Sequence, residues 1–150
     1  MHAIDPKRVL IGGAAAGVVM NAIDIAANWL IVDNGLRQRL DAINPALWAQ
    51  MNAPGRLMQY ILVDFFFAMA LVWLYAAIRP RFGPGPKTAV RAAIYGWALY
   101  TVTQFLFVMM GLFTMRYVMQ TAIVLLVNYI ASALVGAKLY REAGATSASG

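Results

Sequence analysis

The sequence predicts an all-α integral membrane protein, in which a bundle of four transmembrane helices forms one domain. Of its 150 residues, 62% are apolar and 12% are charged, and the mean hydropathy is +0.67, a balance outside that of soluble domains. Each crossing needs about 20 apolar residues, so the chain has room for one bundle and for no second folded domain. The apolar runs are long and continuous, which excludes the short alternating strands of a membrane β-barrel.

The four predicted helices follow the apolar runs of the chain, each with a single charged residue, which are residues 9–32, 57–78, 89–112 and 117–139. Asp5 followed by Pro6 is typical of an N-cap and a first helical position ahead of the first run. The prolines and glycines of RPRFGPGPKTA, residues 79–89, predict a break between the second and third helices, with Thr88 as the cap of the third. The small polar residues of 143–150 predict a flexible tail.

The connection between the first and second helices, roughly residues 33–56, is unusually long. It contains NPALWAQM, in which Asn44 can cap a short helix that starts at Pro45. Leu47 and Trp48 would then face the lipid headgroups. We expect an interfacial helix that covers the bundle, and a lid over an outward-facing pocket is the alternative.

The distribution of basic residues predicts how the helices are oriented. Eight fall on the side of the two termini and of the 79–89 break, namely Lys7, Arg8, Arg79, Arg81, Lys87, Arg91, Lys138 and Arg141. Four fall on the opposite side, namely Arg37, Arg39, Arg56 and Arg116. Because Lys and Arg are enriched in cytoplasmic segments, both termini are expected in the cytoplasm, with Trp29, Trp48, Tyr60 and Tyr117 at the outer interface. Topology thus explains the net charge of +6, and no nucleic-acid binding is expected.

A row of small and polar residues marks one face of the first helix. Its members follow one another at steps of four, four, three and four residues, and they are Gly13, Gly17, Asn21, Asp24 and Asn28. This spacing places them on one side of a helix. The GxxxG pair permits another helix to approach closely, and the amides and the acid can hydrogen-bond across the contact.

Residues on the other three helices predict faces that meet this row. We expect six polar side chains to form a cluster in the outer half of the bundle: Asn21, Asp24, Asn28, Asp64, Gln104 and Asn128. We expect the small residues to pack helices together, and these are Gly13, Gly17, Ser132 and Gly136.

Asp24 and Asp64 are expected at the same depth in the membrane. Asp24 lies eight residues from Val32 and Asp64 lies seven from Leu57, so a rise of 1.5 Å per residue places both about 10–12 Å below the outer boundary. A carboxylate that faces lipid is costly, so both should point into the bundle. Without Lys or Arg at that depth, double ionisation is disfavoured, and at least one acid is expected to carry a proton. A shared proton, a bound cation or a water-filled pocket would each satisfy the pair.

Several functions are disfavoured by residues that the sequence lacks. It has no Cys, which excludes disulfides, thiolate metal sites and Fe–S ligation, and its one histidine, His2, precedes the first helix. No nucleophile, metal cluster or phosphate loop accompanies the two aspartates, so we expect no cofactor and no enzyme activity. Six methionines fall toward the outer side and would suit Cu(I), although methionine is also ordinary apolar filling. They are Met51, Met58, Met109, Met110, Met115 and Met119.

The segment WLYAAIRPRFGPGPKTAVRA resembles a group of small, mostly uncharacterised bacterial inner-membrane proteins with four predicted helices. Those proteins share an RPRFGPGPKTA-like inner loop, a glycine-rich first helix and a last helix that ends near LYRE. The resemblance implies a bacterial cytoplasmic membrane and the same topology. It implies no activity and no functional residues.

Two functional hypotheses follow from these observations. The first is a non-catalytic membrane protein that associates with itself or with the subunits of a larger membrane complex, which the small-residue faces favour. The second is a carrier or channel for protons or cations that uses Asp24 and Asp64. A pocket for a small polar ligand is a third interpretation of the same cluster.

Overall fold

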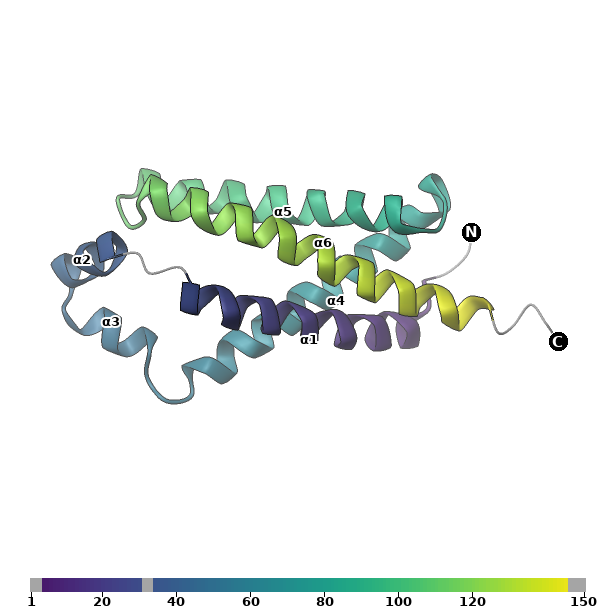
Figure 1. Ribbon diagram of the computed structural model, residues 1–150, viewed down its shortest axis with the longest axis horizontal. Coiled ribbons are helices and arrows are strands. Elements are labelled where there is room, and N and C mark those ends of the chain that lie inside the picture. The colour runs from purple at the N-terminus through teal and green to yellow at the C-terminus, as the bar shows by residue number, and fades with distance from the viewer. Residues whose placement is uncertain (1–3, 31–33, 146–150) are drawn as a thin grey trace.

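The computed structural model describes residues 4–30 and 34–145, and over these residues the chain is all-helical. Four of the described helices are long and apolar enough to cross a membrane, namely α1 (Pro6–Leu30), α4 (Arg56–Phe82), α5 (Pro86–Met109) and α6 (Met115–Ala145). α1 packs against both α4 and α6, and α6 packs against α5, as Figure 1 shows. The predicted all-α architecture with four apolar spans is therefore confirmed.

The bundle has two distinct ends. At one, which we call the termini end, α1 starts, α4 connects to α5, and α6 finishes (Figure 1). At the other, which we call the loop end, α5 connects to α6, and two short helices, α2 (Asn34–Ile43) and α3 (Ala46–Met51), lie beside that connection. The basic residues that were expected on one side belong to segments at the termini end.

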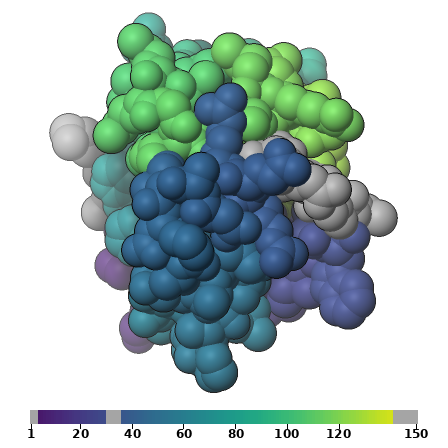
Figure 2. Space-filling view, turned by 90° about the vertical axis from the view of Figure 1, so that its left-hand side faces the viewer, coloured from purple at the N-terminus to yellow at the C-terminus, as the bar shows by residue number. Residues whose placement is uncertain are grey.

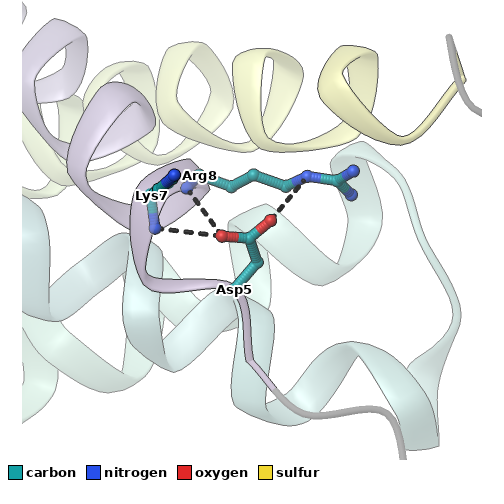
Figure 3. A network of polar contacts seen from close by, with 3 residues as sticks. All are labelled: Asp5, Lys7 and Arg8. Atoms are coloured by element: carbon teal, nitrogen blue, oxygen red, sulfur yellow. Dashed lines mark hydrogen bonds and ion pairs between the residues drawn. The ribbon is translucent and has the colours of Figure 1, made fainter.

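Asp5 caps the first helix, as predicted. Its carboxylate accepts hydrogen bonds from the backbone N–H groups of Lys7 at 3.0 Å and Arg8 at 3.4 Å, and it forms an ion pair with the Arg8 guanidinium at 3.1 Å (Figure 3). Pro6 occupies the start of the helix, where its missing N–H costs no hydrogen bond. The helix therefore begins at the predicted first helical position, three residues before the apolar run that starts at 9. Its predicted last residues, 31 and 32, lie outside the described residues.

The second span extends four residues beyond its predicted end at 78, through a proline. Pro80 removes one helical hydrogen bond, yet α4 continues to Phe82, and the N–H of Gly83 donates to the Arg79 carbonyl at 2.9 Å. The predicted break at 79–89 is therefore shorter than expected. Gly83 has a φ of 80° and Gly85 a φ of 128°, and these backbone conformations turn the chain into α5.

The third and fourth spans also differ from the predicted 89–112 and 117–139. α5 starts at Pro86, so the prediction that Thr88 caps this helix was wrong, and the Thr88 hydroxyl instead donates to the Gly83 carbonyl at 2.7 Å. α5 ends at Met109, two residues before Gly111 with its φ of 76°. α6 continues to Ala145, so residues 143–145 are helical rather than part of a flexible tail, and 146–150 lie outside the described residues.

The long connection at the loop end contains two helices, where one was predicted. α3 starts at Ala46, one residue after the predicted Pro45, and the Asn44 side chain accepts the Ala46 N–H at 2.9 Å. α2 was not predicted, because its apolar face is a single turn wide: Leu36 and Leu40 are buried among polar neighbours.

α2 and α3 lie across the loop end of the bundle, which faces the viewer in Figure 2. The Arg39 guanidinium of α2 donates to the Gly111 carbonyl in the α5–α6 connection at 3.2 Å. The Arg37 guanidinium lies over the Trp48 ring of α3, 5.6 Å from its centre. These contacts tie the two short helices to each other and to the end of the bundle.

Small residues pack the bundle toward its termini end. Alanines from α1, α4, α5 and α6 fill most of this core, and they are Ala16, Ala68, Ala76, Ala89, Ala92, Ala93, Ala133 and Ala137. Such residues let helix backbones approach closely, which is how helices associate in lipid. Many large apolar side chains point outward instead, for example Val18, Leu62, Leu99 and Ile123. This inverted pattern fits a bundle whose surroundings are hydrocarbon.

Candidate functional site

A cavity of about 320 Å³ lies between α1, α4, α5 and α6, in the half of the bundle toward the loop end. Five of the six polar residues that the sequence singled out line it, namely Asn21, Asp24, Asn28, Asp64 and Gln104. The described residues around it include two acids and no Lys or Arg. We call this space the acidic cavity.

The floor of the acidic cavity is the point where the alanine-rich core ends. Met20 of α1 and Tyr129 of α6 belong both to the buried core and to the cavity lining. Toward the loop end, polar and aromatic side chains join aliphatic ones in the lining, for example Asp24, Tyr100 and Leu125. The cavity thus begins where close backbone packing stops.

The Asp24 carboxylate is held in place by α6. The side-chain amide of Asn128 donates to an Asp24 carboxylate oxygen at 2.6 Å and to the Met20 carbonyl at 3.1 Å. Ser132 in turn donates to the Asn128 side-chain carbonyl at 3.1 Å, and both of these α6 residues are fully buried. Asn128, the sixth residue of the predicted cluster, therefore lies behind the acid and orients it, rather than lining the cavity itself.

Asp64 on α4 is placed very differently. Its side chain is half-buried and lines the same cavity. Across the described part of the chain, its carboxylate accepts no hydrogen bond and forms no ion pair. The two acids therefore share one cavity, with Asp24 held by an amide and Asp64 left without a protein partner.

The three remaining predicted polar residues also differ in their surroundings. Asn21 is buried, and its amide donates to the Gly17 carbonyl at 2.9 Å and to the Ile61 carbonyl of α4 at 3.4 Å. It therefore links α1 to α4 beside the cavity. Asn28 is exposed near the end of α1, and Gln104 is half-buried on α5. Neither side chain has a hydrogen bond within the described residues.

Tyrosines form a part of the cavity wall that sequence reasoning missed. Tyr60, Tyr100, Tyr117 and Tyr129 all line it, although Tyr60 and Tyr117 were expected at the outer interface and the other two were not singled out. Helical spacing was the available signal, because Tyr100 lies four residues before Gln104. Thr121, which also lines the cavity, stands seven residues before Asn128.

Three of the lining rings form a continuous aromatic wall across α4, α5 and α6. The Phe67 and Tyr100 rings meet edge to face with their centres 5.8 Å apart, and the Tyr100 and Tyr129 centres are 6.4 Å apart. Tyr129 is 4% exposed, and its hydroxyl has no hydrogen-bond partner within the described residues. The ring of Tyr129 is buried but its hydroxyl oxygen is not, since Thr101 Oγ1 is the only fully buried side-chain polar atom without a partner among the described residues, so the Tyr129 hydroxyl is available to a bound molecule or to water in the cavity.

The predicted helix-packing residues make contacts within the chain. Gly13 and Gly17 lie against Met69 and Phe65 of α4, so the GxxxG pair serves the α1–α4 contact. Gly136 lies against α1 and against Val72, and Ser132 is buried beside it.

Sequence reasoning missed Gly12, which faces α6. A Cβ atom at Gly12 would lie 2.7 Å from the Gly136 carbonyl oxygen, which no ordinary packing permits. Among the described glycines, the closest approach to the backbone of another helix is thus between α1 and α6. Gly12, which makes this contact, directly precedes Gly13, the first residue of the GxxxG pair that the sequence analysis singled out.

The described residues contain no group of three or more His, Cys, Asp or Glu side chains that could hold a metal ion. The six outer methionines are all exposed, and none lines the acidic cavity. The chemistry of the site is therefore that of two carboxylates, amides, hydroxyls and aromatic rings.

Comparisons of the chain with family models, with curated proteins and with solved structures find no match.

Proposed function

We propose that this chain is a carrier or channel for a proton or another cation, which binds at Asp24 and Asp64. The observation that supports the proposal is the sharing of one cavity by two carboxylates, without Lys or Arg among its described lining residues. Taking a carboxylate out of water without a positive partner is costly, in proteins generally and in membranes especially. The acidic cavity is therefore complementary to positive charge.

The unequal surroundings of the two acids give them different roles in this proposal. Asn128 holds Asp24 in one position, so Asp24 is a fixed part of the site. Asp64 has no such partner and is the group that accepts and releases the cation. Intramembrane carboxylates that face a cavity commonly mark ion or proton routes, which favours this use of the pair.

The proposed topology places the acidic cavity toward the outside of a bacterial cytoplasmic membrane. The larger number of basic residues in segments at the termini end favours a cytoplasmic position for both termini. α2 and α3 would then lie in the outer headgroup region, with the amphipathic α2 turning its buried leucines toward the bundle. A cation would enter from that side.

Association with another copy or with other membrane subunits stays a prediction. The small-residue faces that suggested it are used inside the chain, between α1 and its neighbours α4 and α6. They therefore supply no separate argument for a partner. Light scattering of the protein purified in mild detergent measures its oligomeric state directly, and a lone monomer would count against association.

The proposal is tested by recording charge movement in proteoliposomes on a solid support after concentration jumps of protons, potassium or methylammonium. The wild-type chain is expected to give a current with at least one of these cations. Asp64→Asn, which keeps the shape of the side chain and removes its charge, should abolish that current. The matched control is Asp41→Asn, because Asp41 lies on α2 in a half-exposed ion pair with Arg37 and does not line the cavity.

If the wild-type protein gives no current with any of the three cations, the proposed transport function is overturned. If the double variant Asp24→Asn, Asp64→Asn still gives a current at full expression, transport does not depend on these two residues. Equal loss in Asp64→Asn and Asp41→Asn would assign the effect to damage of the fold rather than to the cavity.

A further inference from the structure

We infer that the acidic cavity binds an organic ammonium ion with an apolar body, rather than a bare inorganic ion. This inference rests on the proposed function, since it names the class of cation that the same site would take. The argument uses the size of the cavity, the chemistry of its wall and the state of its buried polar groups.

Size is the first argument. The cavity of about 320 Å³ is on the order of ten times the volume that one water molecule occupies in the liquid. A bare inorganic cation needs several oxygen ligands close around it, which a space this large does not bring together. Cavities that bind small organic molecules begin at about this volume.

The composition of the wall is the second argument. Aromatic and aliphatic side chains make up most of the lining, with the Phe67, Tyr100 and Tyr129 rings as a continuous surface on one side. Aromatic faces attract ammonium groups and also pack against apolar groups. Small-molecule sites combine such a wall with a few polar groups that orient the ligand.

The placement of the polar groups is the third argument. Asp64 lines the cavity without a protein partner, and the hydroxyl of the buried Tyr129 is also free within the described residues. An ammonium group has several N–H donors, so separate N–H groups can donate to the Asp64 carboxylate and to the Tyr129 oxygen. Asp24, held by Asn128, adds a second negative group in a fixed position.

The test is isothermal titration calorimetry on the full chain in detergent, with phenethylammonium chloride as the probe. Its neutral counterpart, 2-phenylethanol, has the same aromatic body and no ammonium group. We expect the ammonium compound to bind at least about tenfold more tightly than the alcohol, because the lining carries two acids. Titration of each compound into empty detergent micelles measures the background heat. Titration of sodium chloride into the protein at equal concentration measures the heat that an inorganic cation produces.

Two pairs of variants separate the charge from the rings. Asp64→Asn should weaken binding of phenethylammonium at least about tenfold, whereas Asp41→Asn should leave it unchanged. Tyr100→Leu should weaken binding about threefold to tenfold, whereas Tyr100→Phe, which keeps the ring, should bind within about twofold of wild type. If a variant aggregates, the inference is still tested by the wild-type protein, whose affinities for the ammonium compound and for the alcohol are compared without any substitution.

The outcomes distinguish the inference from the proposed function. Binding of phenethylammonium that exceeds binding of the alcohol and depends on Asp64 supports the inference. Equal affinity for the two compounds, or no binding of either beside clear currents with potassium or protons, overturns it and leaves the proposed transport intact. If the wild-type protein shows neither binding of phenethylammonium nor any current, both the inference and the proposed transport are overturned. If it binds phenethylammonium but gives no current with any cation, the inference of a binding site is supported and the proposed transport is overturned.

Discussion

The side-chain amide of Asn128 on α6 lies 2.6 Å from a carboxylate oxygen of Asp24 on α1 and donates a hydrogen bond to it. This contact joins the first and last spans at the floor of the acidic cavity, and Ser132 extends it by a further hydrogen bond. The same side chain thereby stabilises the α1–α6 contact and sets the position of one of the two acids. A change at Asn128 should therefore affect both the stability of the bundle and the geometry of the site. A change at Asp64, which has no such contact, should affect the site without weakening the bundle.

Replacement of Asn128 by Ala is expected to destabilise the bundle by about 1–2 kcal/mol. It removes the donor to Asp24 and to the Met20 carbonyl, and it leaves the buried Ser132 hydroxyl without its acceptor. Denaturant unfolding in detergent, followed by circular dichroism, measures the change. Val127→Ala is the matched control, because Val127 is an exposed neighbour on the same helix. Similar losses in the two variants would contradict a special role for the Asn128 network.

Replacing each acid by Leu is expected to affect stability unequally. Asp64→Leu removes a half-buried carboxylate that has no described partner, so the free energy of unfolding should stay the same or rise. Asp24→Leu removes the acceptor of a buried amide, so it should leave the protein less stable than Asp64→Leu by about 1 kcal/mol. The same unfolding assay ranks the two variants. The reverse order would show that Asp64, and not Asp24, is the structural acid.

Gly12→Ala is expected to destabilise the contact between α1 and α6 by about 1–3 kcal/mol. The added methyl group would meet the backbone carbonyl of Gly136, and backbone cannot move aside as a side chain can. Melting temperature in detergent reports the loss. Ala14→Leu serves as the control, since Ala14 lies in the same turn on the exposed face. A Gly12→Ala protein as stable as wild type would mean that the two helices are farther apart than described.

The proposed topology predicts which end of the bundle a membrane-impermeant maleimide reaches in intact cells. The chain has no Cys, so a single introduced one is the only thiol available. Gln38→Cys on α2 should be labelled from outside, and Pro84→Cys between α4 and α5 should require permeabilised cells. Both positions are exposed, so access is limited by the membrane rather than by burial. The opposite labelling pattern would invert the topology and turn the acidic cavity toward the cytoplasm.

Much of the fold could be predicted from local sequence. The four spans follow from apolar runs, because hydrocarbon forces the backbone into helices whatever the partners are. The start of α1 follows from Asp5 and Pro6 for a similarly local reason. Helix ends were less accurate, since Pro80 lies in the final turn of α4, where losing one hydrogen bond is tolerable.

The polar cluster was predictable in composition but not in arrangement. Helical spacing put Asn21, Asp24 and Asn28 on one face, and the cost of lipid-facing charge turned Asp64 inward, without knowledge of any contact. Periodicity describes one helix at a time, however. It could not show that Asn128 holds Asp24 while Asp64 has no such partner.

The sequence by itself determined that the chain has four apolar spans, and it predicted two acids at similar depth, because length, hydropathy and helical period are properties of single segments. Tertiary structure alone decided that helices meeting through alanines and glycines near the termini end separate around a tyrosine-walled cavity toward the other. That outcome depends on how side chains from four helices fill the space between them. Such filling involves partners more than a hundred residues apart in the sequence, as the pairing of Asp24 with Asn128, separated by 104 positions, illustrates.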